Sequence, residues 1–505
     1  MKQYVMVVDR GSTSVKAVVF DKMGNEILSS SYASQKPVSY NPGWWEQDMD
    51  LIWASTSNAI KGVFSSGKVK ADDIMGVFVT GQGNGLMPID KNGKPARMGV
   101  LSLDSRAAEI YDMWNEDGRY NEAIKILGMP FVVGSPLPIL AWLKKYNRKE
   151  FDNIDKILFS KDWIRYKLCG NACTDQTDVS GAGMMDIQKY DYAYDVFSML
   201  DLDEIKDKLP IIRKSHEVVG EVTKQASYET GLNEGTKVLC GAQDTCAYPF
   251  GIGTLSNRQL VSVVGTWGMN IVATQDISNA LVAIYHSVPD YFITGFGDGN
   301  SGGCLDIMVN NFCQEEKLEA FQTGKSVYEL IENKIKDLKP TGIIFQPFVF
   351  GSLFNSSESA GFYGIKNWHS KADILKAVYE GIVMGHCMYI KAIPGNEDFE
   401  AIWLIGGGAK GEVFGQTFAD VLNIPVRIAE TSEITARGGA MNAFVGLGVY
   451  ENHEQACIPP KIKKEFIPNP ENHKFYSEKF RLFCKIRETN RDIWSEIDNI
   501  NRNKF

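Results

Sequence analysis

The sequence predicts an α/β protein with two related domains, and three observations support this fold class. The chain has 505 residues, 44% of them hydrophobic and 11% aromatic, which is too long for one core and sufficient for two. β-Branched runs at 4–8 and 15–20 flank a Gly/Ser/Thr loop, and a similar pattern returns at 260–264 and 269–273. The copies are too far apart to be a solenoid period, so they indicate two similar domains.

The charge and cysteine content exclude several classes of protein. Lys+Arg 53 against Asp+Glu 62 gives a net charge of −9, and without a long basic run neither nucleic acid nor an anionic membrane is an expected partner. No apolar run reaches the roughly 18 residues of a membrane span, and neither a signal peptide nor an anchor is expected. Nine irregularly spaced cysteines indicate reduced thiols in the cytoplasm rather than disulfides or a zinc site.

The first hairpin ends in a tip that suits a phosphate group. Asp9 closes its first strand, and the loop at 10–14 supplies backbone N–H groups and hydroxyls. These groups can donate to phosphoryl oxygens, while an acid at the strand end can hold Mg²⁺ through water. An ordinary N-terminal hairpin is the alternative interpretation.

Residues 43–48 read Gly-Trp-Trp-Glu-Gln-Asp and suit a polyhydroxylated ligand. A tryptophan ring can cover the C–H face of a sugar, while Glu46 and Gln47 take hydroxyls. Alternatively, one tryptophan packs and the acids cap the helix predicted at about 50–64.

Two further strands are followed by polar side chains. The strand predicted at 74–80 leads to Gln82, and a strand-turn unit at 99–103 ends in Asp104 and Arg106. Ligands of α/β sheets gather beyond the carboxyl ends of strands, which makes these three residues candidate hydroxyl ligands. Asp104 can equally cap the helix predicted at 107–114.

Asp244 follows the strand predicted at 237–240 and precedes a helical run. A carboxylate in this position can accept the proton of a substrate hydroxyl as the hydroxyl attacks phosphorus. Here too, a simple helix cap is the alternative. The region 120–209 is predicted to be mostly helical and to wall a substrate pocket, and the tail 453–505 is predicted to form packing helices.

Two stretches imitate known nucleotide motifs. Residues 62–69 nearly match a P-loop, but they lack the final Ser/Thr and follow a helix rather than a strand. Residues 406–411 read G-x-G-x-x-G before a helix at 413–422, a strand at 425–429 and Glu430. No series of βαβ units follows, and such a turn can also lay backbone against an adenine ring, so dinucleotide binding is the weaker interpretation.

Residues 360–365 and 373–381 strongly resemble the C-terminal signature of the FGGY family of carbohydrate kinases. The resemblance covers nearly the whole chain in order. It includes residues 9–16, 43–48, 81–82, 104–106, 174–186, 241–244, 265–266 and 406–408.

This resemblance implies a fold with two ribonuclease-H-like domains, as in sugar kinases, hexokinase and actin, flanking an ATP cleft that closes on substrate. The domains are expected at 1–253 for sugar binding and catalysis and at 254–452 for the nucleotide, with a helical tail at 453–505. The expected substrates are ATP with Mg²⁺ and a small sugar, and the resemblance allows a homodimer.

The resemblance also implies residue roles. Asp244 would be the base, and Asp9 would hold Mg²⁺ through water. Phosphate contacts would come from Gly11, Ser12, Thr13, Ser14, Lys16, Gly265 and Thr266, and adenosine contacts from Gly407, Gly408 and Gln416. The sugar pocket would contain Trp45, Glu46, Gln82, Asp104, Arg106 and Asp244.

Residues 81–83, 265–267 and 348–352 look most like the L-xylulose kinase branch, which predicts phosphorylation of a ketopentose at its terminal hydroxyl. Erythritol kinases share residues 81–83, so a polyol is the alternative. A nucleotide switch of the actin type without catalytic activity is the alternative from another class of protein.

Two residues depart from the family pattern. Ile139 stands where lysine is usual. Arg10 stands at a usually uncharged position, where it is either a phosphate contact or a surface charge.

Overall fold

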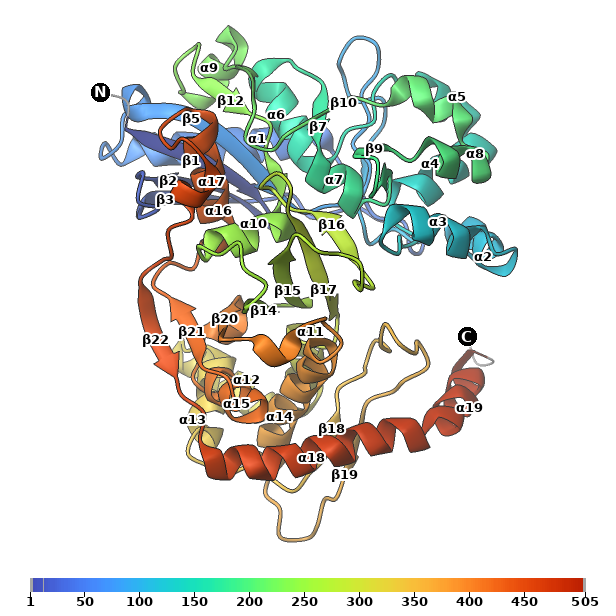
Figure 1. Cartoon of the computed structure of the whole chain (residues 1–505), viewed down its shortest axis with the longest axis vertical. Helices are drawn as coiled ribbons and strands as arrows, with labels where there is room; N and C mark the ends of the chain where they lie inside the picture. The colour runs from blue at the N-terminus through green and yellow to red at the C-terminus, as the bar shows by residue number, and fades with distance from the viewer. Residues whose placement is uncertain (1–2, 12, 503–505) are drawn as a thin grey trace. The chain divides into compact units, whose positions relative to one another are not determined.

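The computed structural model describes residues 3–11 and 13–502, with side chains described to residue 500. The chain divides into two compact units (Figure 1). Unit 1 comprises Met1–Leu255, Ala273–Thr294 and Glu433–Pro460, and unit 2 comprises Ser256–Val272, Gly295–Ser432 and Lys461–Phe505. Each unit contains strands and helices, so the predicted α/β class with two units is confirmed.

The sheet of unit 1 begins with the predicted meander. Strands β1 (Tyr4–Arg10), β2 (Ser14–Phe20) and β3 (Glu26–Ala33) pair antiparallel in sequence order. On the other side of β1, β5 (Ile74–Gly81) runs parallel to it. The sheet is completed by β12 (Lys237–Leu239), β11 (Val218–Glu221) and β13 (Ala242–Gln243).

Side chains that alternate along β1 cover two separate cores, as the period of two in a strand requires. Met6 and Val8 pack in the cluster formed with α1 and α6, whereas Val5 and Val7 pack in the cluster formed with α10 and α16. The bounds of these helices are Met49–Ser65 for α1, Ser160–Cys169 for α6, Asp244–Gly251 for α10 and Ile434–Gly446 for α16. Two helical layers therefore enclose the sheet.

The region from 120 to 209 is mostly helical, as predicted, and together with the preceding helix α2 it contributes most of one hydrophobic core. The helices are α2 (Ala108–Glu116), α3 (Arg119–Leu127), α4 (Pro136–Tyr146), α5 (Arg148–Asn153), α6, α7 (Gln176–Gly181) and α8 (Tyr194–Met199). The short strand β7 (Cys173–Asp175) leads directly into α7.

Unit 2 contains the second predicted hairpin, β14 (Gln259–Val264) and β15 (Gly268–Thr274). Strand β20 (Ala401–Ile405) runs parallel to β14, and β21 (Val426–Ala429) runs parallel to β20. The helices named below are α11 (Gly302–Phe312), α13 (Val327–Ile335), α14 (Lys371–Ile390) and α15 (Val413–Leu422).

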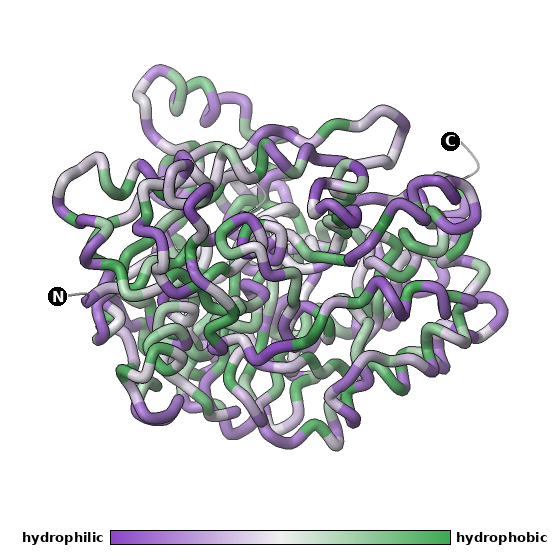
Figure 2. Tube along the Cα trace, turned by 90° about the horizontal axis from the view of Figure 1, so that it is seen from above, coloured by the Kyte–Doolittle hydropathy of each residue, from purple (hydrophilic) through white to green (hydrophobic). Residues whose placement is uncertain are grey.

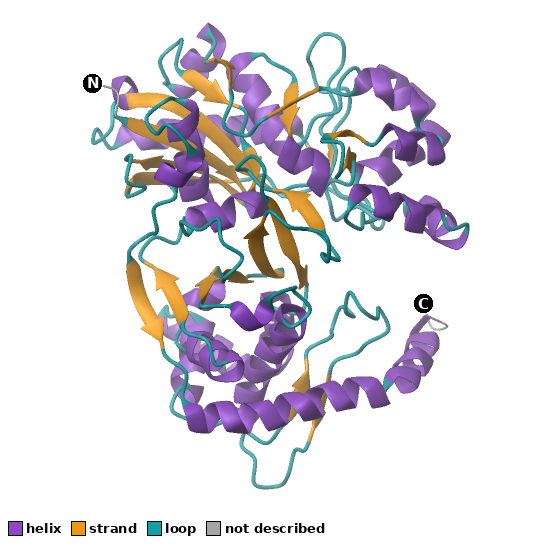
Figure 3. Ribbon diagram, viewed as in Figure 1, coloured by secondary structure: helices purple, strands orange, loops and turns teal. Residues whose placement is uncertain are grey.

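The tail differs from the prediction of helices alone. It contains α17 (His453–Ala456), α18 (Pro470–Thr489) and α19 (Arg491–Arg502), but Ile462–Phe466 forms β22, which pairs antiparallel with β21 (Figure 3). The strand-turn unit predicted at 99–103 is present as β6 (Gly99–Val100) and the turn that follows it. In unit 2, Ile344–Gln346 forms β18.

Hydrophilic and apolar stretches alternate along the whole trace in Figure 2. Within the described residues, no helix combines the length and apolar character needed to cross a membrane.

Candidate active site

Strand register in unit 1 brings the predicted metal contact and the predicted base to one edge of the sheet. Asp9 in β1 lies opposite Thr80 in β5, and Thr80 lies opposite Ala242 in β13. These strands are parallel, so their carboxyl ends meet at the same edge. Asp244 stands two residues beyond Ala242 as the first residue of α10.

The acids at this edge influence each other. Burial, followed by the charges of Asp244 and Glu433, raises the pKa of Asp9 to about 7, and Lys16 acts in the opposite direction. Burial also raises the pKa of Asp244 to about 6, against the Thr245 backbone N–H, which lowers it. A carboxylate with a pKa close to the working pH is suited to accept a proton.

Arg10 is a buried residue of this edge, only 1% exposed, and not a surface charge. Its Nη2 donates a hydrogen bond to Oε1 of Gln47. Nε and Nη1 are buried and have no hydrogen-bond partner within the described part of the chain. Burial lowers the pKa of Arg10 to about 10, while the charge of Asp244 opposes this shift and Arg10 in turn lowers the pKa of Asp244.

The hairpin tip is closed by backbone contacts. The Gly11 N–H donates to the Ser14 carbonyl at 3.0 Å, and the Thr13 carbonyl accepts from the Ser34 N–H at 2.9 Å. Thr13 is exposed, and Lys16 Nζ lies 2.8 Å from Glu433 Oε1. Ser12, also predicted at this tip, lies outside the described residues.

The acids predicted for the sugar pocket are held by arginines. Asp104 Oδ1 and Oδ2 accept from Nε and Nη2 of Arg106, each at 2.8 Å, and Oδ2 also accepts from the Trp45 N–H at 2.7 Å. Glu46 Oε1 lies 2.8 Å from Arg106 Nη2. The alternative role of Asp104 as a helix cap does not apply, because the cap residue of α2 is Ala107.

The two adjacent tryptophans have different environments. The Trp44 ring lies edge-on to Trp142, with centroids 5.1 Å apart, and the Arg106 guanidinium carbon lies 4.2 Å from its centroid. Trp45 keeps 38% of its surface exposed. One ring therefore packs, as the alternative interpretation held, while the other remains available to a ligand.

Gln82 lies beside Arg10 and the Asp244 turn. Its backbone N–H donates to the Arg10 carbonyl at 3.1 Å. The next residue, Gly83, is packed so closely on Gln243 that a Cβ there would lie 2.2 Å from Gln243 Nε2. The structure thus brings Asp9, Arg10, Gln82 and Asp244 into one neighbourhood.

In unit 2, glycines bring three backbone segments together around the second hairpin. The Gly302 N–H donates to the Gly265 carbonyl at 2.7 Å, and a Cβ on Gly302 would lie 2.5 Å from that carbonyl oxygen. Gly406 has φ +87°, and a Cβ there would lie 2.8 Å from the Val264 carbonyl oxygen. These glycines fix a backbone cradle around the hairpin, because a side chain on either would clash with the neighbouring backbone.

The predicted adenosine residues occupy two places in unit 2. Gly407 and Gly408 follow β20, and a Cβ on Gly408 would lie 2.4 Å from a methyl carbon of Val264. Gln416 lies in α15, where its Nε2 donates to Asp420 at 2.8 Å and to the Ile467 carbonyl at 3.0 Å. It lines a cavity of about 420 Å³ with residues of β22 and α18. Thr266 is exposed at the hairpin tip.

The donor set suits Mg²⁺ held mainly by water. No group of three or more His, Cys, Asp or Glu residues forms a metal cage within the described residues. Magnesium usually keeps several waters and uses one or two carboxylates together with substrate phosphates. Asp9, an acid at the strand end whose pKa is raised by burial and then by the charges of Asp244 and Glu433, fits such a contact.

Several neighbours of the site were not singled out from the sequence. Arg97 forms an ion pair with Glu46, and its Nη1 lies 2.7 Å from Glu150 Oε2. Glu433 forms an ion pair with Lys16 and raises the pKa of Asp9. No pattern in the sequence marks Arg97 or Glu433. Thr177 and Gln243, which contact each other, lie within or beside segments that carry the family resemblance.

Comparisons with known proteins agree with this geometry. Residues 4–251 match the N-terminal domain of the FGGY family of carbohydrate kinases, and residues 260–447 match its C-terminal domain. A probable L-xylulose kinase of Haemophilus influenzae is 27% identical over 97% of this chain and 99% of its own length. The L-xylulose/3-keto-L-gulonate kinase of Escherichia coli is 28% identical over 96% of each chain.

A ligand-bound xylulose kinase from Lactobacillus acidophilus has the same fold, with a TM-score of 0.87 and 20% identity over 98% of this chain and 99% of its own. The two family domains cover most of the sequence, and the family resemblance predicted from the motifs is confirmed. The chain therefore belongs to the FGGY family of carbohydrate kinases and is a sugar phosphotransferase.

Proposed function

We propose that this chain transfers the γ-phosphate of ATP to the terminal hydroxyl of a ketopentose, with L-xylulose as the first candidate. Two of the similar proteins carry L-xylulose in their names, and the motifs at 81–83 and 265–267 favour the same branch. A four- or five-carbon polyol such as erythritol is the second candidate. In this proposal, residues 1–253 bind the sugar, residues 254–452 bind the nucleotide, and the enzyme works in the cytoplasm.

The position and environment of Asp244 carry the proposal. Its carboxylate lies at the sheet edge that holds Asp9 and Arg10, and burial places its pKa at about 6. At neutral pH it is mostly ionised and can accept the proton of the attacking hydroxyl. Arg10 favours the ionised form, because a nearby positive charge lowers the pKa of a carboxyl group.

In each unit, considered by itself, several residues are candidates to contact the phosphates of ATP. ATP supplies the phosphoryl group, and Mg²⁺ neutralises its charge when bound. In unit 1, the Gly11 and Thr13 backbone, Ser14 and Lys16 surround the tip beside Asp9. In unit 2, Gly265 and Thr266 present the backbone fixed by Gly302 and Gly406, and Gly407 and Gly408 follow it.

The sugar would be recognised by Trp45, Gln82 and the cluster of Glu46, Asp104 and Arg106. Nη1 of Arg106 is buried and has no hydrogen-bond partner within the described residues. A substrate hydroxyl that pairs with such a group is strongly preferred over an analogue that leaves the group unpaired. The arginine-bound acids therefore favour discrimination between sugars that differ at one stereocentre.

A kinase assay over tetritols, pentitols, ketopentoses, ketohexoses and glycerol tests the substrate, with the phosphate position of the product read by NMR. L-Xylulose is expected to give the highest kcat/KM. A higher value for glycerol or a hexulose would overturn the substrate assignment and leave the kinase activity standing. ATP turnover that no polyol or sugar changes would instead favour a nucleotide switch of the actin type.

A further inference from the structure

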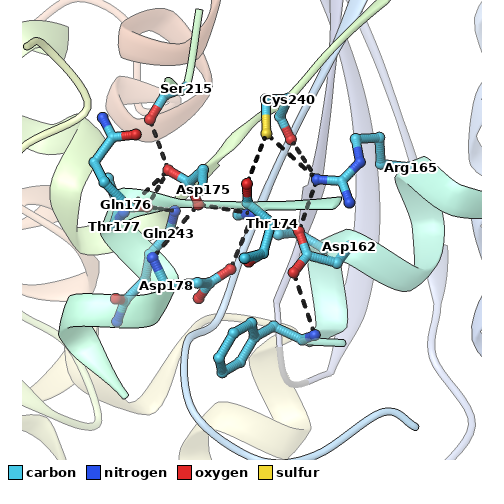
Figure 4. A network of polar contacts seen from close by, with 12 residues as sticks. Asp162, Arg165, Thr174, Asp175, Gln176, Thr177, Asp178, Ser215, Cys240 and Gln243 are labelled. Carbon is cyan, nitrogen blue, oxygen red and sulfur yellow. Dashed lines mark hydrogen bonds and ion pairs between the residues drawn. The ribbon is translucent and has the colours of Figure 1, made fainter. Parts of the chain in front are cut away.

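A fully buried charge cluster lies near Gln243, the residue before Asp244, in unit 1 (Figure 4). Lys161 Nζ lies 2.7 Å from Asp162 Oδ1, 2.9 Å from Asp175 Oδ1 and 3.0 Å from Asp178 Oδ2. Nη1 of Arg165 lies 2.8 Å from the same oxygen of Asp162. Two cations and three carboxyl groups thus share a site with no access to solvent.

The environment of Asp178 disfavours a third negative charge in this cluster. Burial raises the pKa of Asp178 well above its usual range, and Asp162 and Asp175 raise it further, although Lys161 acts in the opposite direction. The raised pKa favours the neutral form of Asp178, in which two cations face two carboxylates. Such a cluster is strongly destabilised when one partner is removed, so it fixes the side chains in one arrangement.

Asp175 connects this cluster to Thr177 and fixes the orientation of the Thr177 side chain. Its Oδ2 accepts hydrogen bonds from the Thr177 hydroxyl at 2.7 Å, from the Thr177 N–H at 3.1 Å and from the Ser215 hydroxyl at 2.7 Å. A threonine hydroxyl has a single proton, and here that proton is used on Asp175. The Thr177 oxygen is therefore oriented as an acceptor, and it receives the Gln243 backbone N–H at 2.7 Å.

The Gln243 side chain is held on both sides by glycines. A Cβ on Gly181 of α7 would lie 2.1 Å from Gln243 Oε1, and a Cβ on Gly83 would lie 2.2 Å from Nε2. Gln243 also pairs with Gly81 as the last residue of β13. Its backbone and side chain are thus both fixed immediately before Asp244.

The Asp244 carboxylate depends on this turn for its position. In the described part of the chain, it accepts a hydrogen bond only from the Thr245 N–H, at 2.6 Å. Arg10 acts on Asp244 through charge and has no hydrogen bond to it. The oxygen of a general base must lie within about 2.6–3.2 Å of the hydroxyl oxygen whose proton it takes, and an error of about 1 Å can cost about 100-fold in rate.

We propose that Thr177 is a positioning residue for Asp244, and that the chain of contacts from Lys161 through Asp175 and Thr177 to the Gln243 N–H fixes the direction of the base. This inference rests on the proposed role of Asp244. The inference assigns α7 a role in orienting the base, although the residues of α7 are buried and do not contact the substrate in this proposal.

Three variants test the inference. Thr177→Val removes the hydroxyl with little change in shape and is expected to lower kcat about 10- to 100-fold, with KM for ATP changed less than about threefold. Thr177→Ser keeps the hydroxyl and is expected to restore most of kcat. Should the valine variant fail to fold, Thr177→Ala removes the same hydroxyl without adding a methyl group.

Ser180→Ala is the matched control, because Ser180 is a buried hydroxyl of the same helix. It donates to the Gln176 carbonyl at 2.7 Å and, at 3.3 Å, to the Thr177 carbonyl, and it accepts from the Tyr285 N–H at 3.0 Å. None of these contacts involves the Thr177 hydroxyl or the Gln243 N–H. We expect a loss of thermal stability comparable to that of Thr177→Val, with kcat within about twofold of the wild type. An equal loss of kcat in both variants would show a general packing effect and overturn the inference.

A double-mutant cycle separates this inference from the role of Asp244. If Thr177 acts through the base, Thr177→Val causes no further loss of the residual rate of Asp244→Asn. The same fractional loss in both backgrounds would show that Thr177 acts elsewhere. An Asp244→Asn variant with full kcat would refute the base itself, whereas an impaired Asp244→Asn beside an unimpaired Thr177→Val would refute the positioning alone.

Discussion

Lys16 Nζ lies 2.8 Å from Glu433 Oε1, across a sequence separation of 417 residues. Lys16 belongs to the first hairpin, and Glu433 immediately precedes α16. The two side chains have opposite effects on the pKa of Asp9, since Glu433 raises it and Lys16 lowers it. The pKa of Asp9 is thus set in part by two residues that lie far apart in the sequence.

Asp244→Asn is expected to lower kcat at least about 100-fold, because it removes the group that accepts the hydroxyl proton. The amide has nearly the same shape, so binding of ATP and sugar, measured by calorimetry, should change little. Asp50→Asn on the exposed face of α1 serves as the control and should keep full activity. An Asp244→Asn enzyme with wild-type kcat would remove this residue from the mechanism.

Arg10→Met should move the acidic limb of the pH–kcat/KM profile upward. Arg10 lowers the pKa of Asp244, so its removal raises that pKa above about 6 and leaves less ionised base in mildly acidic solution. The loss should be largest near pH 6 and smallest above pH 8. Arg10→Lys, which keeps the charge, should hold the limb close to its original place. A uniform loss at every pH would indicate a substrate contact instead.

Asp9→Asn should raise the Mg²⁺ concentration needed for half-maximal activity. The amide is a weaker ligand for a hydrated magnesium ion than a carboxylate, and saturating Mg²⁺ should recover much of the rate. Titration of initial rates with MgCl₂ at fixed ATP measures the effect. An unchanged midpoint would refute the metal contact.

The same Asp9→Asn change should make the protein more stable at neutral pH. The pKa of Asp9 is about 7 in the folded chain, above the usual value of 3.8, so the folded state binds the extra proton between about pH 4 and 7. Its contribution to the free energy of unfolding is present below pH 4 and is lost as the pH rises to about 7. Removal of the ionised acid should gain about 1–3 kcal/mol at pH 8, allowing for partial exposure.

Thermal unfolding of wild type and Asp9→Asn over pH 4–8 measures this gain, which should vanish near pH 4. A variant less stable than the wild type at pH 8 would show that Asp9 makes favourable contacts when ionised.

Gly302→Ala should weaken ATP binding through unit 2. The new Cβ would lie 2.5 Å from the Gly265 carbonyl oxygen, so the hairpin at Gly265 and Thr266 must shift. We expect KM for ATP to rise about tenfold or more, with KM for the sugar little changed. Gly342→Ala is the control, because a Cβ there meets no atom within 4 Å. An unchanged KM for ATP in Gly302→Ala would separate this cradle from nucleotide binding.

The helices and central strands were largely predictable because local patterns agree with the fold. The helix predicted at about 50–64 forms α1 (Met49–Ser65), and in α14 Ser370 and Asp373 form a capping box at the start of the helix. The acid at 48 caps α1 through Asp50 N–H and Leu51 N–H, as one interpretation held. Where apolar periodicity and capping residues coincide, sequence alone is sufficient.

The parts that could not be predicted depend on distant partners. Strand β22 contains exposed lysines and a glutamate at Ile462–Phe466, and only its pairing with β21 makes it a strand. Asp104 was left between two roles because its partners include a backbone N–H 59 residues away. The contact of Thr177 with Gln243 spans 66 residues and is equally invisible in a local pattern.

The place of α16 in unit 1 has a consequence for synthesis of the protein. Its apolar residues, including Ala436, Ala440 and Phe444, share a core with Val5 and Val7 of the first strand. A ribosome adds about 5–20 residues per second, so α16 is synthesised on the order of half a minute after β1. The face of the sheet that carries Val5 and Val7 lacks this helix during that time. Until then the nascent chain exposes an apolar surface, which makes it prone to aggregation during that interval.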